Sequence, residues 1–120
     1  FSPQGTLAER IRCGGAGLGG VLTPVGLGTG IEEGKEVIRV EGKDYLLEKP
    51  IKADVAIIRA SISDEWGNLI YKGTMKNFNP LMAMAAETVI AEADEIVPTG
   101  SLSPEAVHTP HIFVDFIIQH

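Results

Sequence analysis

The sequence predicts an α/β protein with an open, mostly parallel sheet, short flanking helices and one β-hairpin. Apolar runs of strand length occupy 53–60, 88–91 and 112–118, and short helical patterns alternate with them. Two further strand-like segments flank a turn that contains glycine. The first helical pattern begins so near residue 1 that the strand expected to feed it is missing. We therefore expect a fold that is incomplete at its N-terminus.

The composition is that of one globular domain. The 120 residues, 44% of them hydrophobic, suffice for one buried core. A formal net charge of −6 and scattered basic residues argue against a nucleic-acid surface. No apolar run reaches the length of a membrane span, and residues 1–12 lack the apolar core of a signal peptide. We expect a soluble, cytoplasmic protein.

The first helix is predicted from a capping box at its start. Thr6 and Glu9 have the spacing at which each side chain bonds the other residue's backbone N–H. The helix is expected to end at Gly14 or Gly15, since glycine adopts the left-handed conformation that closes a helix. Residues 14–29 then read as a glycine-rich loop.

A hairpin and a buried strand follow this loop. Segments 36–40 and 45–48 are expected to pair across a turn at 41–44. The nearly continuous apolar run at 53–60 is typical of a parallel strand that is covered on both faces.

The second half of the chain alternates turns, strands and short helices. Residues 64–68 read as a turn before a short strand at 69–71. Asn79 suits the N-cap of a helix and Pro80 its first position, and 81–86 is apolar all round, which predicts a buried helix. The remaining expected elements are a buried strand at 88–91, a helical turn at 103–105 and a closing strand at 112–118.

The missing first strand indicates that residues 1–120 are the C-terminal portion of a single, longer subunit domain. A parallel sheet made only from the strands after residue 52 would be thin. The alternative is a complete small domain with an unusual start.

The glycine run from Gly14 to Gly20 invites a phosphate-binding interpretation. A phosphate cradle needs a helix N-terminus behind its glycines, and here the glycines follow a helix. The hypothesis of a nucleotide-binding domain therefore rests on the glycines alone. A close approach of this segment to another backbone, or to a ligand, is the better explanation.

Gln4 and Cys13 are two further candidates. Gln4 lies where a strand would end and a helix begin, the usual ligand crevice of open α/β sheets, and its amide could orient a carboxylate or a carbonyl. A surface or capping role is the alternative. Cys13 is the one cysteine, so an internal disulfide is excluded, and a buried structural residue is favoured over a nucleophile.

Other polar groups give no complete site. Four side chains near the C-terminal end can be drawn as a metal cluster, namely His108, His111, Asp115 and His120. They lack a second carboxylate at ligand spacing, so we expect no metal site. Fragments of a hydrolase triad are present in Ser61, Ser63 and Asp64, but no Gly-x-Ser-x-Gly elbow presents a serine.

The acidic and amide side chains also give no complete site. Carboxylates in polar loops or at hairpin edges are Glu32, Glu33, Glu41, Glu48 and Glu65. None has the apolar, glycine-flanked surroundings that would make it a reactive nucleophile. Asn77 and Asn79 read as turn and cap residues, and a ligand contact by Asn77 stays open.

Taken together, four segments carry a family resemblance. They are "PQGTLAERIRCGGAGLGG" (3–20), "LTPVGLGTGIEEGKE" (22–36), "WGNLIYKGTMKNFNPLMAMAAETVIAEADEIV" (66–97) and "LSPEAVHTPHIFVD" (102–115). In this order they closely resemble the alpha subunit of family I CoA-transferases, with the acetate (butyrate–acetoacetate) and 3-oxoacid types nearest. The resemblance implies the open α/β fold of that superfamily.

The resemblance also implies a reaction and a partner. The family's alpha part begins roughly a hundred residues earlier, and its nucleophilic glutamate lies on a beta subunit, so no catalytic nucleophile is expected in this chain. By resemblance, that glutamate attacks an acyl-CoA, forms a glutamyl-CoA thioester and passes CoA to a second carboxylic acid. Coenzyme A is a substrate, no cofactor is tightly bound, and the enzyme is a hetero-oligomer. A non-catalytic subunit-interaction fragment or paralogue is the alternative.

Residues of the substrate site are carried over from the family pattern. Gln4 matches the family glutamine that lies beside the catalytic glutamate, and Gly5 follows it. Gly17 and Gly19 lie in the matching loop near the pocket. The run Leu18-Gly19-Gly20 resembles the bacterial acetate type, which points to short unbranched acids. No role is assigned to Asn77 or Asn79 on this basis.

Overall fold

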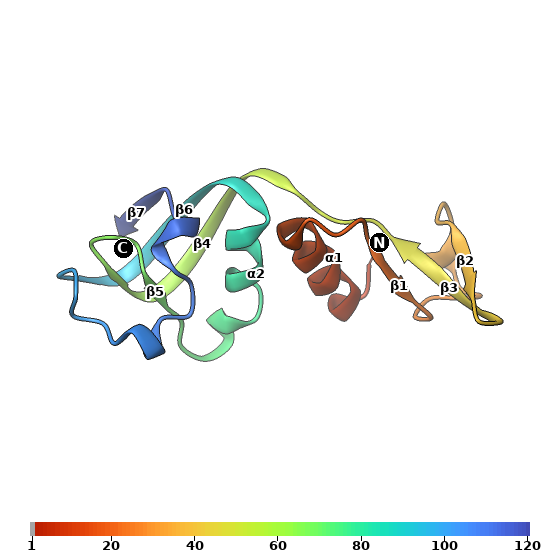
Figure 1. The fold of residues 1–120 in the computed structure, drawn as a ribbon, viewed down its shortest axis with the longest axis horizontal. Coiled ribbons are helices and arrows are strands. Elements are labelled where there is room, and N and C mark those ends of the chain that lie inside the picture. The colour runs from red at the N-terminus through yellow and green to blue at the C-terminus, as the bar shows by residue number, and fades with distance from the viewer. Residues whose placement is uncertain (1) are drawn as a thin grey trace. The chain divides into compact units, whose positions relative to one another are not determined.

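The computed structural model describes residues 2–120, which divide into two compact units (Figure 1). The first unit runs to Lys52 and the second is Ala53–His120. The elements of the first unit are α1 (Gln4–Ala16), β1 (Val21–Thr23), the 3₁₀ helix η1 (Gly30–Glu32), β2 (Val37–Val40) and β3 (Lys43–Glu48). Among the described residues, no helix combines the length and the apolar character needed to cross a membrane.

The first unit contains the predicted hairpin. Strands β2 and β3 pair antiparallel across a two-residue turn, Glu41-Gly42, in which both residues have positive φ (50° and 77°). Such a turn matches the twist of the strands it joins. Strand β3 begins two residues earlier than predicted and lies at the centre of a sheet of order β1-β3-β2. Strand β1 lies in the segment predicted to be loop, which is a correction.

Helix α1 begins before the predicted cap. Its N-cap is Pro3, no side chain of the described residues caps it, and Thr6 is buried within the first turn. The Thr6–Glu9 capping box is therefore wrong. Glu9 instead pairs with Arg12, its carboxylate oxygen 2.8 Å from the guanidinium.

The end of α1 is also later than predicted. The left-handed residue is Gly17 (φ 71°), whose N–H bonds to the Cys13 carbonyl, rather than Gly14 or Gly15. Gly14 has a different reason to be glycine, because a Cβ there would lie 1.9 Å from the Ile51 carbonyl oxygen. Gly20 likewise passes close to Glu48, with a Cβ position 2.8 Å from its carbonyl oxygen. The close backbone approach predicted for the glycine run is thus confirmed.

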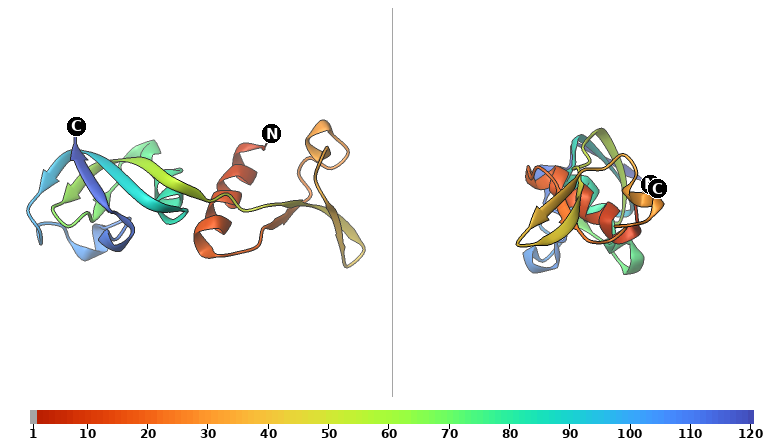
Figure 2. Two further views of the ribbon diagram at one scale, coloured as in Figure 1. Left: turned by 90° about the horizontal axis from the view of Figure 1, so that it is seen from above. Right: turned by 90° about the vertical axis from the view of Figure 1, so that its right-hand side faces the viewer.

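The second unit is built on a four-stranded sheet of order β5-β4-β6-β7 (Figure 1, Figure 2). Strands β4 and β6 pair in parallel from Ala53↔Ala86 to Asp64↔Val97, and β7 pairs in parallel with β6. The elements of this unit are β4 (Ala53–Asp64), β5 (Leu69–Ile70), η2 (Gly73–Lys76), α2 (Asn79–Met84), β6 (Ala86–Val97), η3 (Pro104–Ala106), η4 (His111–Phe113) and β7 (Phe116–Gln119). The mostly parallel sheet is confirmed.

Its core lies on one face of this sheet. Ala56, Ile58 and Ala60 of β4 pack there with Val89 and Ala91 of β6. The second helix contributes one buried residue, Ala83, to this core, and the partly buried Met82 packs against it. The helix predicted to be buried over 81–86 is therefore buried only in part.

Asn79 is the first residue of α2 and not its cap. Its Oδ1 accepts a hydrogen bond from the Arg59 N–H at 3.2 Å, and its Nδ2 donates to the Met75 carbonyl at 2.8 Å. The side chain therefore fastens the helix to β4 and η2, which is a tertiary role that a capping pattern does not reveal.

The opposite face of the sheet is open in this chain. Val55 and Ile57 of β4 are 51% and 70% exposed, and Phe116 and Ile118 of β7 are 60% and 55% exposed. The prediction that 53–60 is covered on both faces is therefore wrong within the described residues. Side chains alternate along β4, and α2 and η2 supply a cover for one side only.

The C-terminal segment was predicted partly correctly. The helical turn at 103–105 is present as η3. The expected strand at 112–118 is divided, because 111–113 forms η4 and only Phe116–Gln119 joins the sheet. The His111 N–H bonds to Asn68 Oδ1 at 2.9 Å, which holds this turn beside the 64–68 loop and delays the strand.

Candidate functional site

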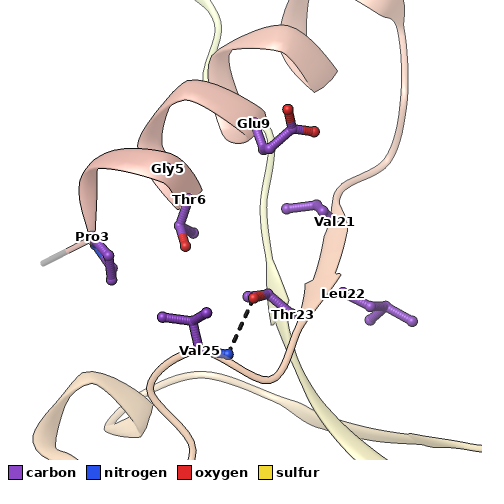
Figure 3. Close-up of a pocket in the computed structure, with 8 residues that line it drawn as sticks. All are labelled: Pro3, Gly5, Thr6, Glu9, Val21, Leu22, Thr23 and Val25. Carbon is purple, nitrogen blue, oxygen red and sulfur yellow. Dashed lines mark hydrogen bonds between the residues drawn. The ribbon is translucent and has the colours of Figure 1, made fainter.

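A cavity of about 350 Å³ lies between the N-terminal turns of α1 and the strand β1 with the loop that follows it (Figure 3). Aliphatic groups form most of its wall. Figure 3 shows Val25 opposite Pro3 and Thr6, and Val21 toward Glu9. The lining residues are Pro3, Gly5, Thr6, Glu9, Val21, Leu22, Thr23 and Val25.

Glycines at the end of α1 build this arrangement. Gly17 closes the helix in the left-handed conformation, and Gly20 (φ 145°) then lies against the Glu48 carbonyl. The chain thereby reverses, and β1 pairs antiparallel with β3 from Val21↔Glu48. This pairing holds Val21 on the side of the first turns of α1, where it closes one wall of the cavity.

Polar groups at the cavity are few, and two of them, on Thr23 and Glu9, are hydrogen-bonded. Thr23 Oγ1 accepts a hydrogen bond from the Val25 N–H at 3.2 Å and fixes the loop (Figure 3). The Glu9 carboxylate is bonded by Arg12, and this hydrogen bond raises the pKa of the Arg12 guanidinium. The cavity therefore has an aliphatic surface, and the carboxylate at one end of it is paired with Arg12.

The start of α1 forms the other end of the cavity. The first N–H groups of a helix have no intrahelical acceptor, and no described side chain caps them here. Together with the helix dipole they favour a negative oxygen near Gln4 and Gly5. The site can therefore hold a small molecule with a carboxylate or carbonyl at the helix end and an alkyl chain along the wall.

The residues predicted to bind substrate lie in two places. Gln4 is exposed on the first turn of α1, and Gly5 lines the cavity. Gly17 and Gly19 lie at and beyond the opposite end of the helix, which is about 20 Å long. The structure brings Gln4 and Gly5 to the cavity region but does not bring Gly17 and Gly19 there.

The amides of the second unit have structural contacts. The Asn77 N–H bonds to the Thr74 carbonyl at the end of η2, and Asn79 joins α2 to β4. A ligand contact by Asn77 remains a prediction.

The histidines near the C-terminal end have separate partners. His108 Nδ1 accepts from the Tyr71 N–H at 3.0 Å, His111 lies against Trp66 with ring centroids 5.2 Å apart, and His120 pairs with Glu92. The Asp115 carboxylate accepts from the Val89 N–H at 2.7 Å. Within residues 2–120, no three His, Cys, Asp or Glu side chains are grouped to hold a metal ion.

The serines do not form a triad. Ser61 Oγ donates to the Met75 sulfur at 3.3 Å, and Ser63 Oγ donates to the Asp64 carbonyl at 2.8 Å. The Asp64 carboxylate is occupied by three bonds within the 64–68 turn, two of them from Asn68. Asp64 and Asn68 thus hold the 64–68 turn together.

Glu48 differs from the prediction of a hairpin-edge carboxylate. It is 2% exposed, and its Oε2 lies 2.9 Å from Lys35 Nζ. A second cavity of about 390 Å³ lies beside this pair, with Arg10 and Lys49 in its wall. A buried, paired carboxylate of this kind is typical of a structural ion pair.

A third cavity, of about 510 Å³, lies where β4 and β6 end. Asp64, Trp66, Asn68 and Pro110 contribute to its wall, and the Trp66 side chain is 64% exposed. None of the predicted substrate-binding residues lines it.

Cys13 is buried, 1% exposed, in the last turns of α1. We therefore expect Cys13→Ser to retain the activity that the family resemblance implies for the full-length protein, because the buried thiol cannot reach a substrate. A thiol-specific reagent should also fail to modify the native protein. Loss of activity without loss of folded structure would assign the thiol to the site.

The sequence did not reveal the second wall of the cavity beside Gly5. The strand Val21–Thr23 is too short for a periodic pattern, and it lies in a segment whose glycines favour a loop. The available signal is local. Two apolar residues and a β-branched threonine directly after Gly20 resemble a short edge strand.

Known proteins resemble this chain throughout. A sequence profile described as Coenzyme A transferase matches residues 1–120. The acetoacetyl-CoA:acetate/butyrate CoA transferase alpha subunit of Clostridium acetobutylicum is 59% identical over 119 residues, 99% of this chain and 55% of that protein. The acetate CoA-transferase subunit alpha of Escherichia coli is 55% identical over 116 residues, 97% of this chain and 53% of that protein.

A solved structure has the same fold. An acyl-CoA transferase of Escherichia coli, crystallised as a thioester complex with CoA, superposes with a TM-score of 0.89. The superposition covers 99% of this chain and 27% of that one, at 23% identity. This chain spans about half the length of the curated relatives it matches.

Proposed function

The chain belongs to the Coenzyme A transferase family, and on this premise we propose that it is the C-terminal part of an alpha subunit that transfers CoA to short-chain acids. The donors are acetyl-, acetoacetyl- or butyryl-CoA, and the acceptor is a free carboxylic acid. The enzyme is a cytoplasmic hetero-oligomer that is inactive without a beta subunit and the rest of the alpha subunit. The observation that carries the proposal is the aliphatic cavity beside Gln4 and Gly5.

The reaction consists of two successive exchanges at one glutamate carboxylate. A glutamate of the beta subunit attacks the acyl-CoA carbonyl and releases CoA thiolate, which leaves an acyl-glutamyl anhydride. The thiolate attacks the glutamyl carbonyl, forms a glutamyl-CoA thioester and releases the first acid as its carboxylate. The second acid then reverses both steps and leaves as its own CoA ester. Contacts to the remote parts of CoA assist these steps when they strengthen at the transition state.

This chain contributes orientation to those steps. The Gln4 side chain can donate to the anionic oxygen that forms at the attacked carbonyl, and it can hold the attacking carboxylate in line. The positive end of α1 favours the same negative charge. The aliphatic wall across from Gly5 accommodates the alkyl part of the acyl group.

Gln4→Ala in the complete enzyme tests the proposal. We expect kcat to fall at least tenfold, or about 1.4 kcal/mol in barrier, because a donor to the reacting oxygens is lost. Assembly with the beta subunit should not change, since the Gln4 side chain is exposed on this chain. Wild-type kcat in this variant would remove Gln4 from the site.

A non-catalytic role, as a subunit-interaction fragment or paralogue of the family, is the second candidate. A fragment or paralogue would bind a beta subunit and yet support no transfer. Assays of the complete alpha subunit with and without the beta subunit separate the two. Transfer that requires the beta subunit supports the enzyme, and binding without transfer supports the interaction fragment.

A further inference from the structure

The cavity beside Gly5 extends along α1 from its start toward Glu9, and Val21 faces the helix at that second end (Figure 3). The helix end near Gln4 and Gly5 favours a negative oxygen, as described above. From there the wall passes Val25, which faces Pro3 and Thr6, and reaches Val21, which lies toward Glu9 (Figure 3). A chain that starts at the helix end therefore meets Val21 last.

We propose that Val21 determines the longest acyl chain that the enzyme accepts, with Val25 as the side wall of the same channel. The proposal rests on the proposed function and adds the length selectivity of the acyl group. A volume of about 350 Å³ holds on the order of ten water-sized groups, at about 30 Å³ each. A four-carbon acyl group fits this space, and a larger side chain at its far end would shorten it.

The backbone makes Val21 a suitable position for this role. It is the first residue of β1, and its pairing with Glu48 of β3 holds it in place. Strand residues alternate in direction, so Val21 and Thr23 share one side of β1, while Leu22, which is 39% exposed, borders the same cavity from the other side of the strand. A substitution at Val21 thus changes the cavity without changing the exposed side of the strand.

Alternative determinants in this wall are weaker. Gly5 has no side chain, and the Thr23 hydroxyl is engaged by the Val25 N–H. The Glu9 carboxylate is held by Arg12. Among the lining side chains that face α1, Val21 lies toward Glu9 and away from the start of the helix (Figure 3), which makes its volume the variable part.

The test compares Val21→Phe with wild type in the complete alpha subunit assembled with its beta subunit. We expect kcat/KM for butyryl-CoA to fall at least tenfold more than kcat/KM for acetyl-CoA, because the added ring occupies the far end. Val40→Phe is the matched control, since Val40 is 42% exposed on β2 and lies outside the cavity wall. Its butyryl-to-acetyl ratio should equal that of wild type.

A second variant keeps the proposal testable if Val21→Phe does not assemble. Val21→Ala lengthens the channel, so kcat/KM for hexanoyl-CoA relative to butyryl-CoA should rise about fourfold for each extra methylene group that is buried. Ratios within twofold of wild type in assembled Val21 variants would overturn the inference. Absence of transfer by wild type with every acyl-CoA would instead overturn the proposed function.

Discussion

Replacing Gly14 with alanine is expected to destabilise the first unit by about 3 kcal/mol or more, as over-packing against a rigid backbone does. The new Cβ would lie 1.9 Å from the Ile51 carbonyl oxygen and 2.7 Å from its carbon. Helix α1 and the 49–51 segment would have to separate. Two bonds would then be lost, from the Ile51 N–H to the Arg10 carbonyl at 3.0 Å and from Arg10 Nε to the Lys49 carbonyl at 2.8 Å.

Gly5→Ala is the matched control in the same helix. No atom lies within 4 Å of its Cβ position, so the substitution should stabilise the protein by up to about 1 kcal/mol through helix propensity. Amide hydrogen exchange of residues 2–52 measures both variants. Exchange in Gly14→Ala as slow as in wild type would show that α1 tolerates the contact by moving as a body.

Replacing Asp64 with alanine is expected to destabilise the second unit by about 3 kcal/mol. Asp64 is 3% exposed, and its carboxylate accepts bonds from the Trp66 N–H at 3.0 Å, the Asn68 N–H at 2.9 Å and Asn68 Nδ2 at 2.7 Å. The variant leaves these donors without their acceptor. Asp54→Ala, at an exposed position of the same strand, is the control and should have little effect.

The loss should also depend on pH. Burial raises the pKa of Asp64, but the bonds from Asn68, Trp66 and Gly67 outweigh it, and the pKa lies below its ordinary value. A lowered folded-state pKa stabilises the protein above the unfolded pKa of about 3.9, and this contribution is lost as pH falls through the folded pKa. Urea unfolding followed by the fluorescence of the single tryptophan, Trp66, should show the loss of unfolding free energy in Asp64→Ala at pH 7 and a smaller loss below pH 4. A deficit independent of pH would contradict the ionised role.

Local sequence patterns predicted the elements better than their ends. The hairpin was predictable because Gly42 supplies the positive φ that a two-residue turn requires. The cap at Thr6 was not, because burial of Thr6 in the first unit competes with a local capping bond. Asn79 fits a cap equally well, yet it bonds the Arg59 N–H of a strand twenty residues away. Contacts between distant segments decided both cases.

The apolar run at 53–60 illustrates a different limit. Its composition correctly predicted a strand in a parallel sheet. It also predicted two covered faces, and the described residues cover only the face of Ala56 and Ile58, while Ile57 is 70% exposed. The composition of a strand indicates that both of its faces can be covered. It does not identify the polypeptide that covers them.

Half of the candidate site was predictable. Gln4 stood out by position and by resemblance, and Gly5 by resemblance alone. Gly5 lines the cavity, and its role in substrate binding remains a prediction. The opposite wall was missed, since Val21 joins the site only through the pairing of β1 with β3, a contact between residues far apart in sequence. The substrate roles of Gln4, Gly17 and Gly19 remain predictions.

The parallel pairing of β4 with β6 has a consequence for the order in which the chain folds. The β2–β3 hairpin closes across two residues, an event of about 1–10 μs. Strand β6 can pair with β4 only across a connection that contains β5, η2 and α2. Closing so long a loop is slow, because its entropy cost comes before the stabilising contacts between the strands form. During synthesis the segment up to Lys52 leaves the ribosome before Ala53–His120, and it can form its hairpin before β6 is available to pair with β4. The time for which the apolar residues of β4 stay unpaired is therefore set by the synthesis and closure of the crossover.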